Sequence, residues 1–207
     1  MLHRIGGPVD YVYFPSSGLV SIVVMMESGR TADTSIVGRE GMVCSAIVFD
    51  VHLAMDQATV EVAGDAMRIR TRAFRAAYKA SEALRSVVNR YNALMLAEAR
   101  QSIACSALHN VEQRLCRWLA EAQDRTDFDR LPVTHEFLAR MLGVQRTTIS
   151  VVYPQLIDAG IVLHGRGHMK LLDPNRLRAR ARVCCRILRE RSELMFPEWV
   201  RSPVSAE

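Results

Sequence analysis

The chain has 207 residues, of which 49% are hydrophobic and 24% charged, so it is long enough for two small domains with buried cores. No apolar run is long enough for a membrane-spanning helix and the first residues lead into no signal-peptide core, so we expect a cytoplasmic protein with no membrane partner. The net charge of +5 is uneven: residues 1–70 hold 5 Lys and Arg against 8 Asp and Glu, and residues 71–207 hold 22 against 14. A basic C-terminal half is typical of a protein that binds a polyanion, although a merely solvated surface has the same composition.

The first 70 residues predict consecutive β-strands. Runs of β-branched and aromatic residues alternate with turns that are rich in Gly, Ser and Pro. Strands are expected at residues 9–14, 19–26, 31–37, 57–62 and 65–70. Such a series of hairpins is typical of a small barrel.

Two helices are expected next, a short one capped by Thr71 and ending near Tyr78, and a long one capped by Ser81. Apolar residues recur along the long helix at alternating steps of three and four. This heptad stripe consists of Leu84, Val87, Tyr91, Leu94, Glu98, Gln101, Cys105 and Leu108. The stripe predicts a helix that pairs with its copy in a homodimer, although a helix buried in a monomer would have the same spacing.

Residues 104–110 are expected to form a hinge. From Asn110 a further helix would carry its apolar residues into a core and leave Arg114 and Arg117 facing solvent. A polar linker at residues 124–130 would connect this helix to the next pair.

Residues 131–158 predict two short helices joined by a sharp turn. Thr134 is a candidate cap for the first, and Gly143 supplies the positive φ that the turn requires. Ala139, Gly143 and Ile149 have the spacing of a helix-turn-helix, which needs a small residue, a turn residue and a branched apolar plug at these places. Two ordinary core helices remain the alternative.

The second helix of this pair, from about Arg146, would present polar residues at its start. These candidate DNA contacts are Gln145, Arg146, Thr147, Thr148 and Ser150. Arg can bridge guanine O6 and N7, Gln can bridge adenine N6 and N7, and Thr and Ser can bond either kind of base edge. Pro154 predicts a kink or an early end after these residues. Residues 161–172 predict a β-hairpin, or wing, with Arg166 at its tip as a phosphate contact.

The helix pair and hairpin resemble the winged helix of the Crp/Fnr family of bacterial transcription regulators, and residues 8–177 are similar to that family in the order and spacing of their elements. The resemblance implies an α+β fold: a partial jelly-roll, cyclic-nucleotide-binding-like β-barrel, a long dimerisation helix and a C-terminal winged helix-turn-helix. The domains would be a sensor-like jelly roll at 1–70, the short helix and the dimerisation helix with its hinge at 71–109, the DNA-binding domain at 110–177, and a basic C-terminal tail at 178–207.

The sequence departs from the family in its first domain. The family normally has opening strands before the one that corresponds to residues 9–14, so their absence would leave a strand edge that something must cover. Asp56 and Gln57 stand where cyclic-nucleotide-binding members have a phosphate-binding pair that includes Arg, and a carboxylate repels a phosphodiester. We therefore expect no response to cyclic AMP. Arg39 or Arg68 could receive another anion, or both could be surface charges.

The resemblance implies a sequence-specific DNA-binding transcription regulator whose partners are double-stranded DNA and a second copy, with RNA polymerase and an unidentified small-molecule effector as further candidates. We expect no cofactor, no metal and no enzymatic activity. The alternative is an effector-binding module that does not read DNA. A nucleophile set of Cys44, His52 and Asp56 would lack an oxyanion donor.

Other residues with chemical potential have ordinary explanations. A metal site that uses His164, His168 and the Cys184-Cys185 pair would match no common zinc spacing. Five cysteines, an odd number, weigh against a disulfide framework. Arginines crowd residues 176–191, where they could add phosphate contacts or form a solvated basic surface.

Overall fold

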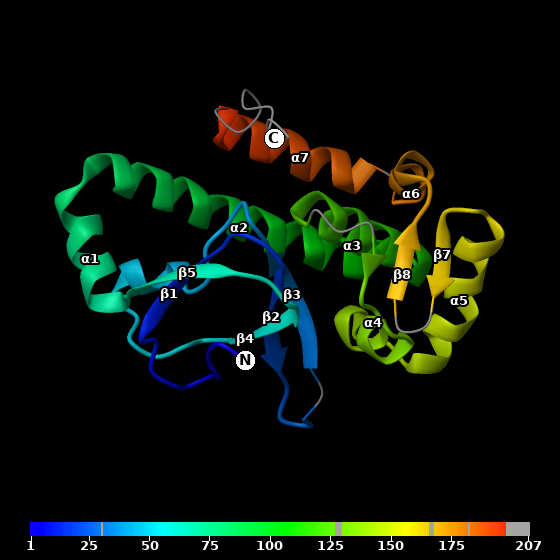
Figure 1. The fold of residues 1–207 in the computed structure, drawn as a ribbon, viewed down its shortest axis with the longest axis horizontal. Coiled ribbons are helices and arrows are strands. Elements are labelled where there is room, and N and C mark those ends of the chain that lie inside the picture. The colour runs from blue at the N-terminus through cyan, green and yellow to red at the C-terminus, as the bar shows by residue number, and fades with distance from the viewer. Residues whose placement is uncertain (30, 127–129, 166–167, 182, 198–207) are drawn as a thin grey trace.

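The computed structural model describes residues 1–29, 31–126, 130–165, 168–181 and 183–197. Figure 1 shows the strands of the N-terminal region at one end of an elongated molecule and a compact group of helices with a small sheet at the other. The long helix α2 (Glu82–Leu108) runs between the two ends. The expected mixed helix and strand architecture is confirmed.

The N-terminal region consists of two antiparallel sheets. β1 (Tyr11–Pro15) pairs with β5 (Ala66–Arg70), and β2 (Leu19–Met25) lies between β3 (Thr31–Val37) and β4 (Gln57–Val62). A short 3-10 helix, η1 (Ser45–Phe49), lies in the connection from β3 to β4. All five strands lie where the turn pattern predicts them, within two residues at each end.

The chain itself covers the strand edge that the sequence left open. Residues 2–7 run beside residues 54–58: the amide of Leu2 donates to the Ala58 carbonyl at 2.8 Å, and the amide of Ala54 donates to the Gly7 carbonyl at 2.9 Å. Ala58 already pairs with Ile22 on its other side. The start of β4 is therefore bonded on both edges, which removes an exposed template for aggregation.

Helix α1 (Thr71–Ala80) follows β5 directly, and its predicted cap is wrong. Thr71 is the first helical residue, and its hydroxyl donates to the carbonyl of Val9 at 2.6 Å. The side chain thus ties α1 to the segment before β1. Ser81 caps α2 as predicted, because its hydroxyl accepts from the Leu84 amide at 3.2 Å.

Helix α3 (Val111–Arg125) begins with a reciprocal capping box between Asn110 and Gln113. Leu115 and Leu119 are fully buried, as predicted. Arg114 and Arg117 are half-buried, not exposed as expected, since Arg114 Nη2 donates to the Leu142 carbonyl and Arg117 Nη2 donates to Ser102 Oγ at 2.8 Å. The face of α3 that the sequence pattern assigns to water is therefore partly covered by neighbouring elements of the fold.

The C-terminal region is a winged helix-turn-helix. It comprises α4 (His135–Leu142), α5 (Arg146–Asp158), α6 (Pro174–Arg180) and an antiparallel sheet in the order β6-β8-β7, formed by β6 (Arg130–Leu131), β7 (Val162–Gly165) and β8 (His168–Leu171). The hydrophobic core of this region is continuous through α3, α4, α5, the wing and α6.

Residues 183–197 are not an extended tail. Helix α7 (Val183–Met195) lies along α2 (Figure 1). The ring of Phe196 is buried in the core of the N-terminal region, and the guanidinium of Arg90 on α2 lies 4.9 Å from its centroid. Burial of the aromatic ring and the cation–π contact hold this segment against α2. None of the described helices is long and apolar enough to cross a membrane.

Candidate nucleic-acid interface

The turn between α4 and α5 has the geometry that its sequence predicts. The Thr134 hydroxyl accepts from the Phe137 amide at 3.1 Å, which caps α4. Gly143 ends α4 in the left-handed region at φ 64°, where a side chain would be strained, and its amide donates to the Arg140 carbonyl at 3.1 Å. The glycine therefore turns the chain within three residues and starts α5 at Arg146.

The two helices pack through the small and branched residues of the motif. Ile149 is fully buried and Ala139 is 5% exposed, so the plug and the small residue lie inside the interface between the helices. Trp118 of α3 supports α4 from behind through an edge contact with Phe137 at 5.4 Å between ring centroids. This packing fixes which side of α5 faces outward.

The polar residues at the start of α5 form the outward face. Gln145, Arg146, Thr147 and Ser150 are exposed, and Thr148 is half-buried. The Gln145 side chain does not cap the first turn of α5, in which the Thr148 amide donates to the Gln145 carbonyl at 3.0 Å. The five predicted DNA contacts thus lie together on one helical turn and its flanks.

Pro154 does not end α5, which continues to Asp158. The proline removes one backbone hydrogen bond, but Tyr153 and Leu156 on either side of it are buried in the core. Packing on this face offsets the lost bond, and the predicted early end is wrong. The side chains for base contact all precede the proline.

The wing is confirmed as a two-stranded hairpin in which Gly165 pairs with His168. Arg166, the predicted phosphate contact, lies outside the described residues. His164 was considered from the sequence as a metal ligand together with His168 and the Cys184-Cys185 pair, and the side chains of these two cysteines lie outside the described residues. The centroid of the His164 ring lies 6.1 Å from that of His135 and 5.6 Å from that of Tyr153. Among the described residues, no three metal-binding side chains are grouped so that they could hold an ion.

Helix α2 turns a different face outward from the one that the sequence predicts. Tyr91, Leu94, Glu98 and Cys105 are buried within the chain, which corrects their assignment to a dimer interface. Of the other predicted residues, Leu84 and Gln101 are half-buried and Val87 and Leu108 are exposed. A neighbouring heptad stripe is exposed throughout and consists of Asn89, Ala93, Leu96, Arg100, Ile103 and Ala107.

The helix-turn-helix is docked on the N-terminal sheet. Arg140 of α4 forms an ion pair at 2.8 Å with Glu61 of β4, and Met141 Sδ accepts from Ser21 Oγ of β2 at 3.8 Å. Asp33 of β3 is buried beside them, and this burial, with a smaller contribution from Glu61, raises its pKa to about 7. The charge of Asp33 therefore depends on pH in the interface between the two regions.

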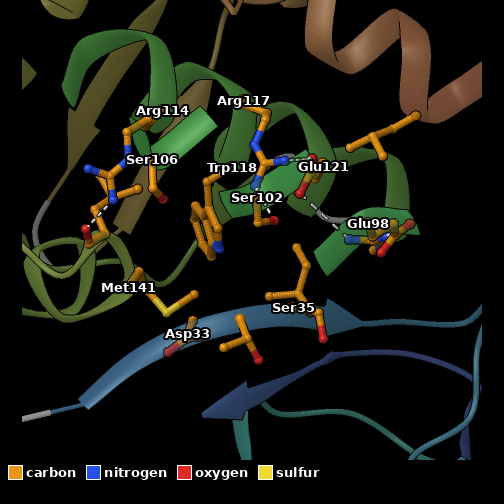
Figure 2. Close-up of a pocket in the computed structure, with 15 residues that line it drawn as sticks. Asp33, Ser35, Glu98, Ser102, Ser106, Arg114, Arg117, Trp118, Glu121 and Met141 are labelled. Atoms are coloured by element: carbon orange, nitrogen blue, oxygen red, sulfur yellow. Dashed lines mark hydrogen bonds and ion pairs between the residues drawn. The ribbon is translucent and has the colours of Figure 1, made fainter. Parts of the chain in front are cut away.

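A small cavity of about 60 Å³ lies where this interface meets α2 and α3. Figure 2 shows Trp118, Asp33, Ser35 and Met141 gathered around it, with Arg117 and Glu121 on the α3 side. The indole Nε1 of Trp118 is buried there without a hydrogen-bond partner. Such polar surroundings suit ordered water between the two regions.

A second cavity, of about 160 Å³, lies within the N-terminal region. Its lining includes neither Arg39 nor Arg68, the two candidate anion contacts, and Arg68 instead lies 4.5 Å over the ring of Tyr11. Asp56 lines this cavity. The position expected for phosphate binding therefore carries a negative side chain in the folded protein as well.

The nucleophile set considered from the sequence is partly assembled, but with a different histidine. His52 Nδ1 faces Arg75 Nη1 at 3.2 Å, whereas His3 lies between Cys44 and Asp56. Sequence reasoning missed His3 because it is 41 residues from Cys44 and 53 from Asp56, and no spacing rule connects such distant positions.

Comparisons with known proteins agree with this geometry. Residues 113–180 match the family model of the Crp-like helix-turn-helix domain. A CRP-family transcriptional regulator from Thermus thermophilus superimposes with a TM-score of 0.71 at 19% identity over 87% of this chain and 92% of that one. A CRP/FNR-family regulator from the same organism gives 0.69 at 23% identity over 87% and 93%.

The c-di-GMP responsive global regulator CLP from Xanthomonas campestris gives a TM-score of 0.66 at 18% identity over 83% of this chain and 89% of that one. No curated protein matches the sequence. The domain match and the shared fold support a DNA-binding transcription regulator.

Proposed function

Residues 113–180 are a Crp-like helix-turn-helix domain on a chain with the fold of the CRP/FNR regulators, and from this premise we propose that the protein is a homodimeric, sequence-specific regulator of transcription. We propose further that cyclic AMP is not its effector. RNA polymerase and an unidentified small molecule remain candidate partners.

The outward polar face of α5 is the observation that carries the proposal. With Ile149 buried as the plug, Gln145 and Arg146 stand at the exposed N-terminal end of the helix, which is the part that enters a major groove in this class of domain. Arg146 and Gln145 would read bases, with Thr147, Thr148 and Ser150 assisting. Arg166, outside the described residues, would hold a phosphate.

The exposed heptad stripe of α2 supports the homodimer. Leu96 is 51% exposed and Ile103 is 70% exposed, and they are seven residues apart on the same face. Ala93 and Ala107 beside them would let two helices approach closely. Arg100 would occupy a polar position in the seam, a feature that sets register in coiled coils at some cost in stability. The partner that fits this exposed heptad stripe is α2 of a second copy of the chain.

The exclusion of cyclic AMP depends on the cavity in the N-terminal region. A cyclic phosphate needs a cation or several donors, but the described lining contains no Lys or Arg and includes the Asp56 carboxylate. CLP, which has the same fold, is described as c-di-GMP responsive, so cyclic AMP is not the general effector of the fold.

The test is selection of bound sequences from a random DNA pool by the purified protein at near-physiological salt. We expect enrichment of a palindrome whose half-sites are about one helical turn, or 10 base pairs, apart. Weak binding that ignores both sequence and salt would instead favour the alternative, an effector-binding module that does not read DNA. Isothermal titration with cyclic AMP should give no heat of binding.

A further inference from the structure

Three side chains that are distant in the sequence form a continuous hydrogen-bonded chain in the N-terminal region. The thiol Sγ of Cys44 lies 3.2 Å from His3 Nδ1, and His3 Nε2 lies 2.8 Å from Asp56 Oδ1. The His3 side chain is 6% exposed and that of Asp56 is 39% exposed. A nucleophile within reach of a base that is itself oriented by a third group is the arrangement of an activated nucleophile.

A metal ion does not explain this cluster. The two ring nitrogens of His3 point in opposite directions, Nδ1 to the Cys44 thiol and Nε2 to the Asp56 carboxylate. A single ion bound to one of these nitrogens therefore cannot bind both of the other side chains as well. In the described part of the chain no three such side chains are placed to share an ion. Proton transfer along the chain of hydrogen bonds is the chemistry that its geometry allows.

Cys44, His3 and Asp56 all line the cavity of about 160 Å³ described above. An enclosed space of about 150 Å³ holds a molecule the size of benzene. Most of the other lining side chains are apolar, among them Val9, Ile22, Met42, Ile47, Met55 and Met95. The cavity therefore suits a small apolar organic molecule better than a strongly hydrated one such as hydrogen peroxide.

The surroundings of Cys44 make a base necessary for any reaction of its thiol. Burial, followed by the negative charge of Asp56, raises the pKa of Cys44 to about 12, so very little free thiolate forms at neutral pH. A thiol of this kind is inert unless its proton leaves during the reaction itself. His3, with Nε2–H donated to Asp56, has its Nδ1 lone pair directed at that proton.

We propose that Cys44 is a covalent modification site for a small apolar α,β-unsaturated carbonyl compound, with His3 as the general base and Asp56 as the residue that positions it. The thiol proton moves to His3 Nδ1 as Sγ bonds to the β-carbon, and the electron pair of the carbon–carbon double bond passes into an enolate. The imidazolium then returns the proton to the α-carbon. All atoms of both reactants are in the thioether product, so the step needs no oxidant or reductant.

The test measures the rate of cysteine modification in the folded protein without DNA. Cyclopent-2-enone is the probe, and mass spectrometry of peptides gives the rate for each cysteine. We expect Cys44 to react in the wild type and His3→Ala to lower its rate about 100-fold, the usual contribution of a general base. Added imidazole should restore part of the loss, which a purely structural role of His3 would not predict.

Two further variants make the result specific. His52→Ala is the matched control, since His52 faces Arg75 and does not line the cavity, and it should leave the rate unchanged. Asp56→Asn should slow the reaction in the wild-type background but not in His3→Ala, because a positioning residue acts through the base. In His3→Ala the loss of the Asp56 charge, which raises the pKa of Cys44, should leave the rate unchanged or raise it slightly.

The outcome that overturns the proposal is equally definite. The His3→Gln variant has a side chain of nearly the size of the imidazole ring, and it replaces His3→Ala in the test if His3→Ala lowers the melting temperature. If Cys44 reacts as fast in folded His3→Gln as in the wild type, His3 is not the general base. If Cys44 is labelled only after unfolding in urea, it is not a modification site of the folded protein.

Discussion

The guanidinium Nη2 of Arg125 lies 2.7 Å from Glu98 Oε1, which joins the end of α3 to the middle of α2. The Nε of the same guanidinium lies 3.0 Å from Glu40 Oε1, in the turn after β3. One buried cation thus connects the sheet region, the long helix and the DNA-binding region. Burial raises the pKa of Glu98, and Arg125 opposes this effect by stabilising the carboxylate.

The first prediction concerns this ion cluster. Arg125→Met should lower the free energy of unfolding by about 3–5 kcal/mol, the usual cost of leaving buried charges without their partner. Urea unfolding at pH 7 measures the change. Arg72→Met, at an exposed site on α1, is the control and should have little effect. A loss in Arg125→Met no larger than in the control would mean that the carboxylates do not depend on Arg125.

The second prediction concerns pH and Asp33. Its pKa is about 7 in the folded protein, through burial, against an ordinary value of 3.8. Between these two values the unfolded chain has released the proton and the folded chain has kept it, so stability falls as pH rises from about 4 to 7. Asp33→Asn removes this dependence and should be stabilising at pH 8 relative to the wild type.

Measurement of unfolding free energies at pH 4, 6 and 8 checks the sign. The advantage of Asp33→Asn should grow by an amount on the order of a few kcal/mol between pH 4 and 8, since one pKa unit corresponds to about 1.4 kcal/mol. Asp65→Asn, at an exposed turn, should not change with pH in this way. An advantage that is the same at all three pH values would show that Asp33 ionises normally in the folded state.

The third prediction tests base reading by α5. Arg146→Ala should weaken binding to the selected palindrome by about 1–3 kcal/mol and relax the base preference at one position of each half-site. Competition binding against variant sites measures both effects. Arg72→Ala removes the same charge from α1 and should leave the preference intact. Equal losses on cognate and random DNA would assign Arg146 to the phosphate backbone.

The fourth prediction tests the exposed seam of α2. Leu96→Glu with Ile103→Glu should convert a dimer to a monomer at micromolar concentration, because two like charges would face each other across the two-fold axis. Sedimentation equilibrium gives the mass. Met67→Glu replaces another exposed apolar side chain, on β5, and should leave the dimer unchanged. A dimer that survives the double substitution must associate through another surface.

The sequence by itself determined the elements and the helix-turn-helix. Strand ends follow from turn residues, the starts of α2 and α4 follow from Ser81 and Thr134, and the sharp turn follows from Gly143, because each depends on interactions within a few residues. The spacing of Ala139, Gly143 and Ile149 then identified the packed pair, and with it the exposed polar turn that follows.

Only the tertiary structure decided which surfaces these elements share. Two adjacent stripes of α2 both have heptad spacing, and packing against the N-terminal region, not the pattern, selects the one with Tyr91 and Leu94 for burial. The same holds for Thr71, which bonds Val9 instead of capping a helix, and for His3, which meets Cys44 across 41 residues. Contacts between distant segments depend on the relative placement of whole elements, and periodicity within one element carries no information about that placement.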